Sequence, residues 1–238
     1  MTDAPPVSQV RWPKAHRIIR SLYPPIALFE DIADPADWDA VSRAEAATNA
    51  RVSETIGKLD AVPPERRVSG PGASWVMAPF THHSVDRPSR FTDGSYGVYY
   101  AGDRIEVALF ETIHHHERFL ARTGEAPGWT SQFRELVGSL DAALHDLRCD
   151  DFEGALRPDD HRAGQDLARH LRTEGSAGLV YPSVRCPDGE AVALFWPDVA
   201  GVPVQGRHYA YHWDGARVDL VRDEGSGETF AVNRDAEG

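Results

Sequence analysis

An arginine, an aromatic strand and an acidic helix residue follow one another within residues 89–114, SRFTDGSYGVYYAGDRIEVALFETIH. Glu111 falls at the edge of the apolar stripe of the helix expected there, so its carboxylate is half-turned toward the core. A carboxylate in that position needs a partner or a chemical role, because burying it unpaired is costly. Spacing alone favours an ion pair with Arg90 or Arg104, and the functional alternative is catalysis by the acid.

Three consecutive histidines, His114–His116, follow Glu111 in the same helix. Successive helical residues point about 100° apart, so three in a row cannot face one metal ion. Glu111 has suitable spacing to His114 or His115, but carboxylate metal sites of that kind use a second such pair. The pattern is interpreted as an exposed, histidine-rich helix end without a metal, and a His-based metallohydrolase is the alternative.

The composition is that of an ordinary globular chain. Its 238 residues carry 25 Lys plus Arg against 37 Asp plus Glu, a formal net charge of −12. An acidic balance opposes broad nucleic-acid binding. No apolar run approaches the roughly 20 residues that span a bilayer, and no secretory signal is visible, so a cytoplasmic location without membrane contact is expected. The common signatures of dinucleotide folds, P-loops and zincin helices are absent from the sequence.

Periodicity and turn residues predict the elements that position these side chains. Helices are expected over 35–60, 104–123 and 160–173, the second opened by a capping pair of Asp103 and Glu106 and the third ended by Gly175. Strands are expected over 74–80, 98–101, 133–137, 142–147, 178–184 and 190–196, with a hairpin around Asp214-Gly215. Strands and helices alternate without a regular βαβ rhythm, which indicates an α+β fold.

The length fits one domain. We expect a loose lead-in over residues 1–15, a single domain over 16–230 with a helical elaboration near 35–60, and a frayed tail over 231–238.

Four pieces of the chain, taken in order, resemble the RES-domain family, which is named for Arg, Glu and Ser residues. They are Ser89-Arg90-Phe91, Val98-Tyr99-Tyr100-Ala101, Ala108-Leu109-Phe110-Glu111, and the segment from Tyr181-Pro182-Ser183-Val184 to Leu194-Phe195-Trp196-Pro197. The opening His16-Arg17-Ile18 also resembles the arginine of the family's first strand. The resemblance covers residues 16 to about 200.

This resemblance implies an ADP-ribosyltransferase-like fold, a mixed β-sheet core with flanking helices. It also implies the toxin of a toxin–antitoxin pair that uses NAD as a substrate, without a further cofactor, and breaks the ribose–nicotinamide bond. The implied partner is an Xre-type antitoxin, and a homo-oligomer within such a complex is compatible with the family. Water, phosphate or a protein could accept the ADP-ribose.

The resemblance assigns roles to five residues. Glu111 would stabilise the oxocarbenium-like ribose, and Arg90 would bind the pyrophosphate and take part in catalysis. Arg17 is a second candidate for binding the pyrophosphate. Tyr100 would form a flat wall against nicotinamide, and Ser183 would position the substrate by hydrogen bonds. The residues alone leave a structural alternative for three of these positions. Tyr100 could equally be a core aromatic, and Ser183 could cap a turn. For Arg17 the residues favour a structural or surface role.

Two alternatives to NAD degradation share this fold. The first is a protein ADP-ribosyltransferase, and the second is a catalytically silent module that binds a partner.

Overall fold

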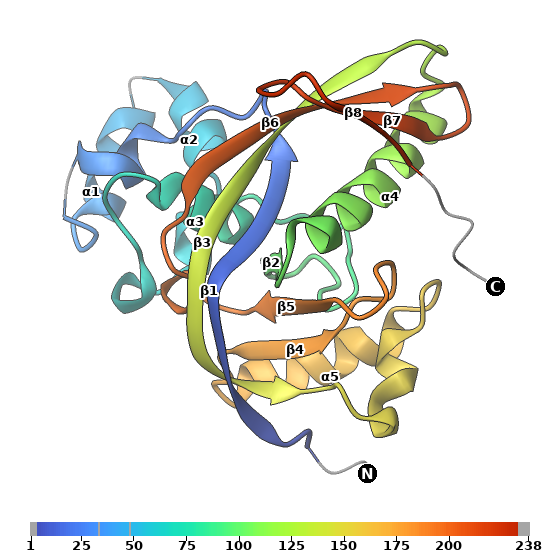
Figure 1. Cartoon of the computed structure of the whole chain (residues 1–238). Coiled ribbons are helices and arrows are strands. Elements are labelled where there is room, and N and C mark those ends of the chain that lie inside the picture. Colours follow the sequence, from blue (N-terminus) through green and yellow to red (C-terminus); the bar gives the residue numbers. More distant parts are fainter. Residues whose placement is uncertain (1–3, 33, 48, 233–238) are drawn as a thin grey trace.

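Two long antiparallel strands organise the fold (Figure 1), β1 (Val7–Arg20) and β3 (Thr130–Asp146). The computed structural model describes residues 4–32, 34–47 and 49–232. The expected lead-in over 1–15 is wrong from Val7 onward, because Val7 to Trp12 pair with β3. The register shifts between Trp12 and Ala15, where Pro13 has no N–H to donate, so the proline sits at a bulge.

Of the remaining strands, three close a ring with β1 and β3, and three extend the sheet beyond β3. They are β2 (Tyr99–Gly102), β4 (Gly178–Pro182), β5 (Glu190–Leu194), β6 (Val204–Trp213), β7 (Val218–Asp223) and β8 (Thr229–Ala231). The order is β1-β2-β5-β4-β3-β6-β7-β8, and β1 also pairs with β3, so the first five strands form a closed ring. Strands β3 and β4 pair in parallel and the other pairs are antiparallel, which confirms a mixed sheet in an α+β fold.

Three short helices cover one side of the sheet (Figure 1), namely α1 (Trp38–Ala46), α2 (Ala50–Ile56) and α3 (Ala73–Thr81). The single helix expected over 35–60 is wrong, because Asn49 accepts a hydrogen bond from the N–H of Arg51 and caps α2 as a new helix. The strand expected over 74–80 is the helix α3. The Glu30 carboxylate accepts from the N–H groups of Gly72 and Ser74 and satisfies the start of this helix from a distant part of the chain.

The two longer helices agree with the predictions, α4 (Ile105–Thr123) and α5 (Arg162–Thr173). Helix α4 packs against β6 and β7. Gly175 follows the end of α5, as expected, and has a left-handed backbone with a φ of 85°. The capping role expected for Asp103 is wrong, because its carboxylate accepts from the Glu190 N–H and pairs with Arg104. Shorter helical turns occupy Leu28–Ile32, Leu59–Ala61, Pro64–Arg66, Asp150–Leu156 and Pro197–Val199.

The paired strands expected near the C-terminus are present. Strands β4 and β5 pair through the turn Cys186–Gly189, and β6 and β7 pair through Asp214-Gly215. The two strands expected over 133–137 and 142–147 are parts of the single strand β3. Of the expected frayed tail, Ala231 belongs to β8 and residues 233–238 lie outside the described residues. Within the described ranges, no helix has both the length and the apolar character to cross a membrane.

Candidate functional site

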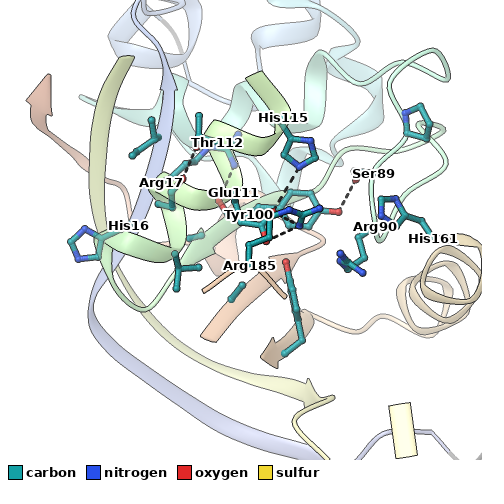
Figure 2. Close-up of a pocket in the computed structure, with 18 residues that line it drawn as sticks. His16, Arg17, Ser89, Arg90, Tyr100, Glu111, Thr112, His115, His161 and Arg185 are labelled. Atoms are coloured by element: carbon teal, nitrogen blue, oxygen red, sulfur yellow. Dashed lines mark hydrogen bonds and ion pairs between the residues drawn. The ribbon is translucent and has the colours of Figure 1, made fainter. Parts of the chain in front are cut away.

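A cavity of about 340 Å³ lies where β1, β2, α4 and the start of α5 meet. The loop before β2 and the turn after β4 complete its wall. A cavity of this size is typical of small-molecule sites. Figure 2 shows the side chains that line it.

Four of the five predicted site residues line this cavity: Arg17 from β1, Arg90 from the loop before β2, Tyr100 from β2 and Glu111 from α4. Ser183 is not among the residues that line it within the described part of the chain. Segments far apart in the sequence therefore bring the predicted arginines, tyrosine and acid to one place.

Glu111 is held by an arginine that the sequence did not indicate. Arg185 Nη1 donates to both carboxylate oxygens, at 3.0 Å from Oε1 and 2.9 Å from Oε2. His115 Nε2 lies 3.9 Å from Oε2, one helical turn along α4. An ion pair of Glu111 was expected with Arg90 or Arg104, so the kind of interaction is right and the partner is wrong. Figure 2 shows Arg185 and His115 both directed at Glu111.

Arg90 is a buried guanidinium at the cavity wall. Its Nη1 donates to the carbonyl of Arg157 at 2.9 Å. Burial lowers the pKa of Arg90 from its ordinary value, and the nearby charge of Arg185 acts in the same direction. An anionic group in the cavity would therefore be favourable for both arginines.

The first turn of α5 fixes the loop that carries Arg90. Gln165 Nε2 donates to the carbonyls of Ser89, at 2.8 Å, and Thr92, at 3.3 Å. A Cβ at Gly164 would lie 2.8 Å from the carbonyl oxygen of Arg90, so the loop approaches the helix too closely for a side chain there.

Tyr100 contributes its ring to the cavity while its hydroxyl serves the protein. The hydroxyl lies 2.7 Å from Ser89 Oγ and accepts from the Phe91 N–H at 3.1 Å. Burial is the main cause that raises the pKa of Tyr100 to about 12. The adjacent Tyr99 lies on the opposite face of β2, in the hydrophobic core, as the period of a strand requires.

Arg17 is half-buried in the wall beside Tyr100. Its Nη1 donates to the Tyr100 carbonyl at 2.9 Å, and its Cζ lies 4.7 Å from the centre of the Tyr99 ring. Burial lowers the pKa of this guanidinium. Its buried Nε has no hydrogen-bond partner among the described residues.

Ser183 has the turn-capping role that was weighed for it. Its Oγ accepts from the N–H groups of Arg185, at 3.3 Å, and Cys186, at 3.1 Å. It thus stabilises the turn from which Arg185 reaches Glu111. A direct contact of Ser183 with substrate stays a prediction.

The sequence reasoning missed Arg185 and His161. His161 lines the cavity, and its Nε2 lies 3.1 Å from the Pro158 carbonyl. Burial lowers the pKa of His161, and the charges of Arg90 and Arg185 add to the effect. The turn that presents Arg185 was predicted, but no local pattern indicates which side chain of a turn faces a helix 74 residues away.

The three consecutive histidines occupy different environments. His115 lines the cavity, whereas His116 is buried between Phe119, Phe133 and Tyr211. The expectation of an exposed helix end is wrong for His116, because this face of α4 packs on the sheet. In the described ranges, no three His, Cys, Asp or Glu residues are grouped as a metal site would require.

The family model of the RES domain matches residues 64–214. The matched range contains Arg90, Tyr100, Glu111, Ser183 and Arg185, and it begins after Arg17.

Two known proteins are similar over most of the chain. An uncharacterised protein y4oC of Sinorhizobium fredii is 28% identical over 206 residues, which are 87% of this chain and 85% of that protein. The crystal structure of the M. tuberculosis MbcT–MbcA toxin–antitoxin complex has a chain with 11% identity and a TM-score of 0.45, covering 84% of this chain and 85% of that one. On the match to residues 64–214, this chain belongs to the RES domain family.

Proposed function

We propose that this protein is an NAD-degrading enzyme that cleaves the bond between ribose and nicotinamide, by hydrolysis or phosphorolysis. The observation that carries the proposal is one carboxylate among several cations in a single cavity. Glu111 is the only acid among the described residues that line it, and Arg17, Arg90 and Arg185 share that cavity.

The carboxylate suits the charge that develops in the reaction. When the C1′–N bond breaks, nicotinamide leaves with the electron pair and the ribose becomes an oxocarbenium-like cation. A carboxylate beside C1′ stabilises that cation more than the neutral ribose, so it lowers the barrier. The new bond forms between C1′ and an oxygen of water or phosphate, and Glu111 can accept the proton that water loses.

The arginines suit the other half of the substrate. NAD carries a diphosphate, and a planar guanidinium binds phosphate oxygens through two parallel donors. We assign Arg90 and Arg17 to this group, and the ring of Tyr100 to the apolar wall against nicotinamide. NAD is the substrate here, and the chemistry calls for no further cofactor.

Membership of the RES family supports a cellular role as the toxin of a toxin–antitoxin pair. NAD loss would arrest growth, and an antitoxin of the Xre type would be the protein partner. Expression should stop bacterial growth, and co-expression with the cognate antitoxin should restore it.

The test is NAD consumption by purified protein, with and without inorganic phosphate, followed by product identification. Free nicotinamide with ADP-ribose indicates hydrolysis, and ADP-ribose 1″-phosphate indicates phosphorolysis. ADP-ribose attached to a protein would favour the ADP-ribosyltransferase alternative. A folded, partner-free protein that leaves NAD intact would contradict the proposal and favour a silent binding module.

A further inference from the structure

We infer that Arg185 is a further residue of this site, which positions Glu111 through one nitrogen and binds an anionic group of the substrate through its remaining donors. The anion of matching chemistry is the diphosphate of a dinucleotide. This inference rests on the proposed function, because it assigns a role in the same cavity.

The ion pair leaves most of the guanidinium unused. A single nitrogen, Nη1, contacts both oxygens of Glu111, whereas an end-to-end pair would use two nitrogens. Among the described residues, Nε and Nη2 of Arg185 have no hydrogen-bond partner in the protein. The Arg185 side chain lines the cavity and is 14% exposed, so these donors can meet a ligand that binds there.

The turn that carries Arg185 packs closely on α4. Ser183 Oγ fixes the backbone of Arg185, and the Ser183 N–H donates to the Gly189 carbonyl at 2.8 Å. A Cβ on Gly189 would lie 2.4 Å from Val107 Cγ2, so the turn sits directly on the first turns of the helix that bears Glu111. The pairing of Arg185 with Glu111 is therefore set by the backbone on both sides.

The surrounding charge favours an anion beside Arg185. Arg90 and Arg185 repel each other, and this repulsion helps to lower the pKa of Arg90. The charges of Arg90 and Arg185 also lower the pKa of His161, which lines the same cavity. Glu111 balances one of these cations, so a phosphate group would balance the other.

The experiment compares Arg185→Ala and Arg185→Lys with the wild type. For Arg185→Ala we expect kcat/KM for NAD to fall roughly 100-fold, with both a lower kcat and a higher KM, because positioning and binding are lost together. Lysine keeps the charge but lacks the planar fork, so Arg185→Lys should keep kcat closer to wild type and still raise KM. Added guanidinium ion should restore part of the turnover of Arg185→Ala, which a merely structural arginine would not permit.

Binding of ADP-ribose gives a readout that does not depend on turnover. Calorimetry should show weaker ADP-ribose binding in both variants, while nicotinamide, which has no phosphate, inhibits each variant as it inhibits the wild type. Arg104→Ala is the matched control, because Arg104 donates to Asp188 of the same turn at 2.7 Å and is not among the described residues that line the cavity. It should bind and turn over like the wild type.

The outcomes separate this inference from the proposed function. A wild type that cleaves NAD, with an Arg185→Ala variant of unchanged kcat, KM and ADP-ribose affinity, overturns the role of Arg185 and leaves the function intact. A wild type that leaves NAD intact overturns the function, and ADP-ribose binding then decides on Arg185. If Arg185→Ala does not fold, the Arg185→Lys measurements decide.

Discussion

Helix α4 has a cavity face and a core face, and each buries a carboxylate in a different way. On the cavity face, Glu111 pairs with Arg185 and keeps 26% of its side chain exposed. On the core face, Glu117 is 9% exposed and accepts a hydrogen bond from the backbone N–H of Val218 at 2.8 Å. The two acids are six residues apart in one helix.

The two carboxylates differ in whether a ligand can reach the group that each one contacts. The N–H of Val218 belongs to β7, so Glu117 ties the helix to the sheet. The partner of Glu111 is a side chain in a cavity, where a ligand can share it. Substitutions on the core face should therefore change stability, and substitutions on the cavity face should change turnover.

Glu111→Gln should have the largest effect on turnover of all the substitutions on the two faces. Glutamine keeps the shape but loses the charge that stabilises the oxocarbenium-like ribose, so we expect NAD turnover to fall by at least about 10³-fold. Initial rates of nicotinamide release measure this effect, and the thermal midpoint should stay near that of the wild type. A Glu111→Gln enzyme with the wild-type rate would remove this carboxylate from the chemistry.

His116 should make the core face sensitive to acid. Burial is the main cause that lowers the pKa of His116 from 6.5 to about 4. Between these values the unfolded chain binds a proton that the folded chain does not, so stability falls as the pH drops from 6.5 to 4. The full effect is about 3 kcal/mol.

Denaturant unfolding across this pH range should reveal the effect as a difference between wild type and His116→Phe. Phenylalanine fits the contacts with Phe133 and Tyr211 and cannot be protonated. Equal losses of stability in the two proteins would show that His116 is not the group responsible.

Glu117→Ala should destabilise the fold by about 2 kcal/mol, because the buried N–H of Val218 loses its acceptor. Glu117→Gln keeps an acceptor oxygen and is the control, with a smaller loss. Chemical denaturation gives the stabilities, and kcat of both folded variants should equal that of the wild type. A drop in kcat without a loss of stability would place Glu117 in the site and break the comparison.

Tyr100→Phe should have the smallest effect. The ring remains, but Ser89 and Phe91 lose the hydroxyl that orders the loop of Arg90, so about 1 kcal/mol of transition-state binding should be lost. This corresponds to a several-fold change in kcat/KM, mostly through KM. If kcat fell as far as it is expected to fall in Glu111→Gln, the Tyr100 hydroxyl would instead take a direct part in the chemistry.

The sequence predicted the elements whose signals are local. Helices α4 and α5 and the two C-terminal strand pairs have apolar periodicity and turn residues within a few positions of each other. Helix α3 was missed because its N-terminus is satisfied by Glu30, more than 40 residues earlier. The start of β1 was missed because only its partner β3 makes that proline-containing segment a strand.

Contacts between distant segments also limited what the sequence could predict about the site. Arg17, Arg90, Tyr100 and Glu111 were identified through the family resemblance and lie at one cavity. Sequence spacing could not select Arg185 as the partner of Glu111, because the turn before β5 and the helix after β2 meet only through the pairing of β2 with β5.

Cleavage of NAD at Glu111 is tested most directly by a crystal structure of Glu111→Gln with NAD, since slow turnover should leave the dinucleotide whole. We expect the nicotinamide ribose against residue 111, with the diphosphate on Arg90 and Arg17 and on the remaining donors of Arg185. NAD bound elsewhere on the molecule, or an empty cavity at NAD concentrations that saturate the wild-type enzyme, would contradict this expectation.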